Sequence, residues 1–180
     1  METLGVDCEE NVLCNVEESS LHTLNNKWTL WAHLPHDTNW TADSYKEIYT
    51  METIESAITL VNTLPDKLIK NCMLFIMREG IKPMWEDEKN RAGGCFSYKV
   101  NNKNIISMWK KLVYKLVCED LVCDKKLTSK INGITISPKR NFCIVKLWLT
   151  DCLIKNPQTI VPIHGLPQQG CLFKKHNPEY

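Results

Sequence analysis

The chain of 180 residues contains 43% hydrophobic and 24% charged residues and carries a formal net charge of +1. These values are typical of one soluble globular domain and exclude a largely disordered, collagenous or membrane-spanning chain. No stretch approaches about 18 consecutive apolar residues. The N-terminus also lacks a basic segment followed by an apolar one. We therefore expect a soluble protein that stays inside the cell.

The charge is unevenly distributed along the chain. Residues 1–20 contain six acidic residues and no Lys or Arg, so residues 21–180 carry +7. Dense acid with little periodicity predicts a flexible N-terminal arm over residues 1–20, followed by one domain over residues 21–180. A basic domain is compatible with an anionic ligand, nucleic acid included.

The nine cysteines do not form a disulfide or zinc framework. Their number is odd and no two are spaced as C-x-x-C, whereas a zinc site needs two such pairs, or one pair with histidines. We expect reduced thiols that pack as small hydrophobic groups, with no bound metal and no cofactor.

After the arm, the pattern predicts two strands and a helix. Lys27–Ala32 is rich in aromatic and apolar residues, and Ser44–Thr50 is the second strand candidate. Thr53 is a plausible N-cap for a helix that runs to Asn62, because apolar residues follow it at helical spacing.

The middle of the chain predicts two more strands around a long loop. Asn71–Met77 is a continuous apolar run, as in a buried strand, and Cys95–Val100 is a further strand. The polar stretch Arg78–Gly94 between them is long for a loop, and long loops are usually functional. Ile105–Glu119 is the clearest helix, since its apolar residues form one stripe.

The last third predicts three strands and one short helix. Ile131–Ile136 alternates until Pro138, Phe142–Leu149 is a strand, Pro157 begins a short helix, and Gly170–Lys174 is a last strand. Strand pairs separated by helices predict an α+β fold, with a mainly antiparallel sheet and the helices packed on one face.

The six tryptophans separate into two groups. Trp28, Trp31 and Trp109 lie on apolar stripes and are expected in the core. Trp40, Trp85 and Trp148 do not fit that pattern well. A loop tryptophan flanked by charge buries little apolar surface unless something stacks on it, although folding back over its own loop is an equal alternative. Two such rings would form a slot about 7 Å wide for a planar ring.

The neighbours of these tryptophans indicate which ring would fit. Aromatic faces attract a cationic base, and Glu86 could accept two parallel N–H bonds from a guanine edge. Lys139, Arg140 and Lys146 could meet a phosphate chain. Other interpretations carry less weight: a magnesium site at residues 86–88, a thiol hydrolase, or a general single-strand RNA binder that uses stacking and charge.

Two sequence motifs resemble those of a known family. The run G-I-K-P-M-W-E-D-E-K-N at residues 80–90, followed by Gly93-Gly94, resembles the central signature of the eukaryotic translation initiation factor 4E family, the messenger-RNA cap-binding proteins. The run H-T-L-N-N-K-W-T-L-W at residues 22–31 is similar to the family's opening motif. The resemblance extends from about His22 to His176.

The resemblance implies a curved antiparallel sheet with helices on its convex back and the cap in its concave face. It implies that Trp40 and Trp85 sandwich the cationic 7-methylguanine, that Glu86 binds the N1 and N2 protons, and that Trp148 contacts the methyl group. The family's two other basic positions are Cys95 and Ile144 here. Phosphate or RNA contacts are expected from the remaining basic residues, which are Lys139, Arg140, Lys146, Lys174, Lys175 and His176.

The back surface departs from the family pattern. The family's partner-binding tryptophan on the first helix is Ile58 here, and the opening Pro is Thr23. The positions expected to face a partner are His22, Ile54, Ile58, Lys110, Tyr114 and Cys118. We expect weak or altered binding to the usual Tyr-x-x-x-x-Leu-Φ motif, because an aromatic anchor is often an interface hot spot.

The resemblance implies a cytoplasmic, monomeric protein, not an enzyme, that binds capped mRNA in translation initiation together with a scaffold protein or inhibitor, and no membrane. A cap-binding translational repressor and a protein-interaction member of the same fold are the alternatives.

Overall fold

The computed structural model describes residues 21–179, and the predicted acidic arm lies outside them. These residues form one antiparallel sheet with the strand order β2-β1-β3-β5-β6-β4-β7. The strands are β1 (Thr23–His33), β2 (Tyr45–Thr53), β3 (Met73–Arg78), β4 (Gly94–Asn101), β5 (Ile131–Pro138), β6 (Phe142–Leu149) and β7 (Leu172–Lys175). The helices are α1 (Ile54–Thr63), α2 (Asp66–Asn71), α3 (Glu88–Arg91) and α4 (Ile105–Val117). The predicted α+β fold is confirmed.

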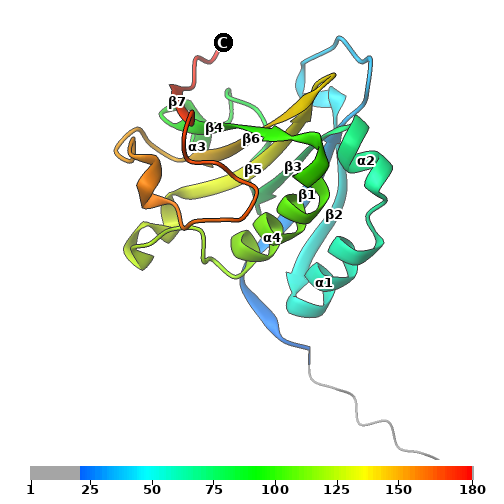
Figure 1. Ribbon diagram of the computed structural model, residues 1–180, viewed down its shortest axis with the longest axis horizontal. Coiled ribbons are helices and arrows are strands. Elements are labelled where there is room, and N and C mark those ends of the chain that lie inside the picture. The colour runs from blue at the N-terminus through cyan, green and yellow to red at the C-terminus, as the bar shows by residue number, and fades with distance from the viewer. Residues whose placement is uncertain (1–20, 180) are drawn as a thin grey trace, which may run out of the picture.

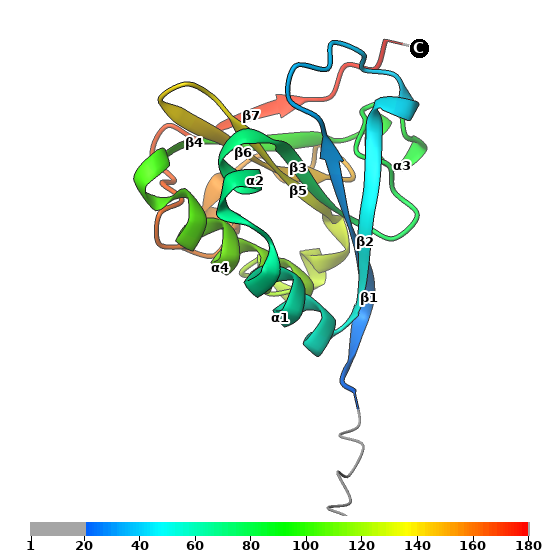
Figure 2. The same cartoon turned by 90° about the vertical axis from the view of Figure 1, so that its right-hand side faces the viewer.

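Three helices cover one face of the sheet, here called the helix face. Figure 2 shows α1, α2 and α4 on one side of the strands and α3 on the other. Helix α4 contacts β1 and β5 and is flanked by α1 and α2. The main core lies between these layers, with Trp28 and Trp109 buried in it as expected.

The predicted start of the first helix is confirmed. The hydroxyl of Thr53 accepts a hydrogen bond from the Ser56 backbone N–H at 3.1 Å, while Ser56 Oγ accepts from the Thr53 N–H at 3.0 Å. Two N–H groups that the helix leaves without a partner are satisfied in this way.

The opposite face of the sheet, here called the open face, carries a second and smaller cluster. Phe75, Met77 and Trp148 are buried in it, and Trp31 packs against it half-buried. The assignment of Trp31 to the main core was therefore wrong. Side chains alternate along a strand, so Trp28 and Leu30 point to the helix face and Trp31 points away from it.

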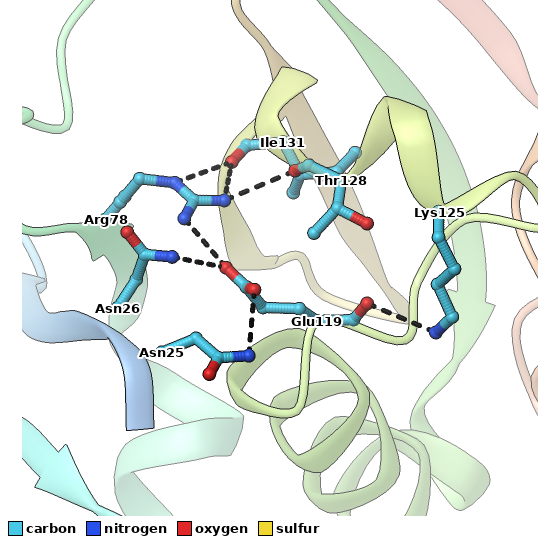
Figure 3. A network of polar contacts seen from close by, with 7 residues as sticks. All are labelled: Asn25, Asn26, Arg78, Glu119, Lys125, Thr128 and Ile131. Carbon is cyan, nitrogen blue, oxygen red and sulfur yellow. Dashed lines mark hydrogen bonds and ion pairs between the residues drawn. The ribbon is translucent and has the colours of Figure 1, made fainter. Parts of the chain in front are cut away.

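An ion pair joins the ends of several elements (Figure 3). Arg78 at the end of β3 donates to Glu119 Oε1 at 2.9 Å, and its guanidinium lies over Trp28. It also donates to the carbonyls of Thr128 and Ile131, while Glu119 accepts from the amides of Asn25 and Asn26. Glu119 has a φ of 55°, in the left-handed region. The network ties β1, β3 and the segment before β5 to the end of α4.

Two short helices were not expected. Helix α2 has six residues after Pro65, too few to show a helical period, and α3 is one turn within the predicted loop Arg78–Gly94. The short helix predicted from Pro157 is a single 3-10 turn, Pro157–Thr159, and the other predicted elements differ by a few residues at their ends.

Candidate functional site

A cleft of about 470 Å³ opens on the open face. The residues that line it come from the β1–β2 loop, from β2, β3, β5 and β6, from the β5–β6 hairpin, from the loop before α3 and from the end of the chain. Figure 1 shows the end of the chain passing beside α3 and β7. The lining residues used below are Trp40, Trp85, Glu86, Lys139, Lys146, Trp148 and Glu179.

The loop that carries Trp85 and Glu86 is held by polar contacts to its own backbone. Asp87 accepts from the N–H groups of Lys82 and Lys89, each at 2.9 Å. Asn90 is fully buried and donates to the carbonyls of Lys82 and Met84, each at 2.9 Å. Both Asp87 oxygens are thus used in shaping the loop. The rigid turn fixes the direction of the tryptophan and the carboxylate.

Trp85 is backed by a histidine from the other end of the chain. The rings of Trp85 and His176 lie 5.7 Å apart, centroid to centroid, with an interplanar angle of 16°. His176 is buried, and its Nδ1 donates to the Asn90 carbonyl at 2.8 Å. Burial lowers the pKa of His176 below its ordinary value. A neutral imidazole therefore supports the indole.

Trp40, which also lines the cleft, is likewise supported by a histidine. Its ring stacks on His33, with centroids 4.0 Å apart and an interplanar angle of 6°. His33 is buried and its Nε2 donates to the Asn39 carbonyl at 2.8 Å, which fixes the ring. Trp40 itself is 54% exposed. One face of the Trp40 ring thus rests on the last residue of β1, at the base of its own loop, while the ring also lines the cleft.

Trp148 lies between the two loops, on β6. It is only 3% exposed, and its Nε1 donates to Thr135 Oγ1 at 2.6 Å. The view that Trp148 is unlike a core residue was thus wrong: most of its ring is buried against Phe75, and the remainder lines the cleft. Gly133, opposite Trp148 on β5, has no room for a side chain.

The Glu86 carboxylate is half-buried in the cleft and already has a partner. Its Oε1 accepts the backbone N–H of Glu179 at 3.2 Å. A ligand that presents two parallel N–H groups to Glu86 would share Oε1 with that contact or replace it. The end of the chain thus occupies the position of a hydrogen-bond donor at this carboxylate.

The fold places the basic residues predicted at the site in different regions of the molecule. Lys139 and Lys146 line the cleft, and Lys146 Nζ lies 5.9 Å from the centroid of the Trp85 ring. Arg140 lies in an adjoining pocket. Lys174 and Lys175 are exposed on β7 and outside the lining of the cleft.

Cys95, which stands at one of the family's basic positions, is buried beside Ser97. Burial raises the pKa of the Cys95 thiol, so this residue adds no charge.

The cleft suits one kind of ligand. Two supported indole rings offer faces to a planar group, a carboxylate accepts from N–H donors, and two lysines attract an anionic tail. Within residues 21–179 no group of histidine, cysteine, aspartate and glutamate side chains could hold a metal ion. The arrangement indicates binding of a purine-like base that carries phosphates.

The predicted partner positions lie on the helix face. Ile54 and Ile58 on α1 are 40% and 43% exposed, and α1 packs beside α4. His22 Nδ1 contacts Glu55 Oε1 at 2.7 Å, and this hydrogen bond is the main cause that lowers the pKa of Glu55 to about 2. The α4 positions form the row Lys110, Tyr114 and Cys118, of which Cys118 is exposed.

Sequence reasoning missed the residues that support the site. His33, Asn90 and Thr135 each hold a tryptophan or its loop through polar or stacking contacts, and Asn132 donates to Asn90 Oδ1 at 3.0 Å. A polar residue inside an apolar strand, such as His33 or Thr135, was the available signal. The partner of Thr135 lies on another strand and that of His33 in the following loop, and neither pairing has a local sequence pattern.

The comparisons with known proteins agree with this geometry. The family model described as eukaryotic initiation factor 4E matches residues 23–175. The chain is 27% identical over 161 residues to a eukaryotic translation initiation factor 4E of Candida albicans, covering 84% of this chain and 75% of that protein. It is 35% identical over 174 residues to eukaryotic translation initiation factor 4E-1B of Danio rerio, covering 89% and 78%.

Solved structures show the same fold. The complex of C. elegans eIF4E-3 with the 4E-binding protein Mextli and a cap analog matches with a TM-score of 0.66 and 29% identity, over 74% of this chain and 76% of that one. Ascaris suum eIF4E-3 with an m2,2,7G cap matches with a TM-score of 0.65 and 26% identity, over the same shares.

Proposed function

Because the chain belongs to the eukaryotic initiation factor 4E family, whose members bind the mRNA cap in translation initiation, we propose that its own cleft holds the 7-methylguanosine cap between Trp40 and Trp85. The observation that carries the proposal is that one cleft brings together Trp40, Trp85, Glu86 and two lysines from distant parts of the chain. Membership identifies a translation factor that binds the 5′ cap of mRNA. The stacking geometry and the residue roles are the proposal.

The proposed roles follow from the charge of the ligand. Methylation at N7 makes guanine a cation, and a cation gains from the negative faces of two indole rings. Glu86 accepts the N1 and N2 protons as a charge-assisted pair of hydrogen bonds. Trp148, with part of its ring in the cleft, contacts the methyl group. Unmethylated guanine lacks the charge and binds more weakly.

The phosphates of the cap meet Lys139 and Lys146. Both side chains line the cleft, and phosphate contacts position a nucleic acid without specifying its bases. Cys95 and Ile144 leave the family's other basic positions uncharged, so the phosphate contacts rest on fewer cations. Lys174 and Lys175 as RNA contacts stay a prediction, whereas His176 is buried behind Trp85 and its predicted contact with RNA is not supported.

Calorimetric titration with 7-methyl-GTP tests the assignment of Glu86. Glu86→Gln replaces one acceptor by an amide donor that opposes the guanine N–H groups, so we expect affinity to fall at least tenfold. Glu88→Gln is the matched control, because Glu88 is an exposed acid two residues away and outside the lining of the cleft. Equal affinities for both variants and the unaltered chain would contradict the role of Glu86.

A second function, cap-binding repression, is favoured by the helix face. An exposed isoleucine stands at position 58, where an aromatic anchor is expected, and Lys110 adds a charge that binding would desolvate. We propose that the chain, acting as a monomer in the cytoplasm, binds a scaffold or inhibitor protein through α1 and α4 with altered preference. A Tyr-x-x-x-x-Leu-Φ peptide is expected to bind Ile58→Trp more tightly than the unaltered chain.

Within residues 21–179, none of the helices is both long and apolar enough to cross a membrane.

A further inference from the structure

A second pocket, here called the basic pocket, adjoins the cleft. Its volume is about 330 Å³. It is lined by residues of α2, of the segment that leads into α4, and of the β5–β6 hairpin: Lys70, Asn71, Asn102, Ile105, Lys139, Arg140 and Cys143. Lys139 lines both the cleft and the basic pocket. Lys139, in the β5–β6 hairpin, thus connects the cleft on the open face with the basic pocket, whose floor residues Ile105 and Cys143 belong to the main core under the helix face.

The charges of the basic pocket are all positive. Lys70, Lys139 and Arg140 are exposed, and no acidic residue is among the lining residues. The ion pairs found between residues 21 and 179 involve none of these three cations. Three uncompensated cations around one concave site produce a positive potential that attracts an anion.

The floor of the basic pocket is fixed by the fold. Ile105 and Cys143 are buried beneath the cations, and Cys143 Sγ donates to Asn102 Oδ1 at 3.4 Å. That contact directs the amide nitrogen of Asn102 away from the thiol, so this nitrogen remains available to donate a hydrogen bond to a ligand. Arg140 lies at the tip of the hairpin that the Lys139 N–H to Phe142 carbonyl bond closes at 2.8 Å. The basic pocket thus contains donors and cations but no aromatic ring to stack a base.

We propose that the basic pocket binds the phosphodiester backbone of the first nucleotides that follow the cap, through Lys70, Arg140 and the shared Lys139. The proposal rests on cap binding in the cleft, which delivers the 5′ end of the RNA to Lys139. Cations with no stacking surface contact phosphates and do not specify bases, so the RNA chain is held without regard to its sequence. The path leads from the cleft past the β5–β6 hairpin toward the end of α2.

Titrations with two ligands on a double variant test this path. Lys70→Ala with Arg140→Ala removes the two cations that belong to the basic pocket alone. We expect its affinity for 7-methyl-GTP to stay within about twofold of the unaltered chain, and its affinity for a capped five-nucleotide RNA to fall about five- to tenfold near 0.1 M salt. The slope of log K against log salt for the capped RNA should become less steep by about 1.4, since each lost contact to a single strand contributes about 0.7.

The matched control is Lys67→Ala with Lys126→Ala, which removes the same charge from two exposed positions outside the pocket. This control should bind the capped RNA within about twofold of the unaltered chain. The proposal is overturned if the capped RNA binds the Lys70/Arg140 variant undiminished, if the control loses as much, or if the whole loss already appears with 7-methyl-GTP. Failure of cap binding itself has a different signature, which is equal binding of 7-methyl-GTP and GTP by the unaltered chain.

Discussion

Neutralising Glu119 should cost far more stability than neutralising Glu52, although both carboxylates meet a cation at the same distance. The N···O distance is 2.9 Å for Arg78–Glu119 and for Lys27–Glu52. Side-chain exposure is 17% and 14% in the first pair but 43% and 54% in the second. Water screens an exposed pair, which contributes about 0.2–1 kcal/mol, whereas hydrogen bonds to charged groups shielded from water contribute about 1.5–3 kcal/mol.

We therefore expect Glu119→Gln to lower the free energy of unfolding by about 2 kcal/mol and Glu52→Gln to change it far less, because water screens the exposed pair. Glutamine keeps the length of glutamate and the same left-handed backbone at position 119, so the change reports the lost charge. Glu119 also accepts from Asn26 at 2.6 Å, a bond that the substitution weakens as well.

Urea denaturation followed by tryptophan fluorescence measures both losses. Double-mutant cycles with Arg78→Met and Lys27→Met isolate the two couplings. Near 1 M salt the exposed coupling should vanish and the shielded one should persist. Equal couplings in the two pairs would refute the view that burial of the network in Figure 3 determines its strength.

Three further predictions concern the helix cap, a buried histidine and the end of the chain. Thr53→Ala removes the N-cap of α1 and should cost about 1 kcal/mol in urea denaturation; an unchanged midpoint would contradict the capping contacts. Burial lowers the pKa of His176, so its imidazole binds a proton more tightly in the unfolded chain than in the folded one. The stability that neutral, buried His176 contributes is fully present above about pH 6.5 and is lost as the pH falls below that value toward the lowered pKa. His176→Gln should therefore show a smaller loss of stability than the unaltered chain between about pH 7.5 and 5.5, and an identical pH profile would show that His176 is not responsible. Deleting residues 178–180 frees Glu86 from the Glu179 N–H and should tighten binding of 7-methyl-GTP about two- to fivefold in calorimetry, whereas weaker binding would mean that the end of the chain assists the ligand.

Much of the fold could be predicted because its signals are local. The apolar stripe of α4, the Thr53 cap and the alternation along β5 each lie within one window of sequence. Helix α2 could not be predicted, because six residues after a proline show less than two turns. Alternation along β1 already places Trp28 and Trp31 on opposite faces, but which of the two faces the helices cover depends on tertiary packing that no local pattern specifies.

The candidate site was predicted in part. Trp40, Trp85 and Glu86 stand out as aromatic and acidic residues in polar loops, and the structure brings all three to one cleft. The contacts that support them join residues far apart in sequence, such as Trp85 with His176. The contact of Glu86 with Glu179 is of the same kind. Such contacts depend on the register of the whole sheet, which no single stretch of sequence specifies.

The central claim is that the cleft recognises a guanine that methylation has made cationic. Its most direct test is the ratio of the dissociation constants for GTP and 7-methyl-GTP, measured by quenching of tryptophan fluorescence in the unaltered chain. A desolvated cation–π contact contributes about 2 kcal/mol, so GTP should bind about 30-fold more weakly, at about 1.4 kcal/mol for each factor of ten. Equal, weak quenching by the two nucleotides would contradict recognition of the cap in this cleft.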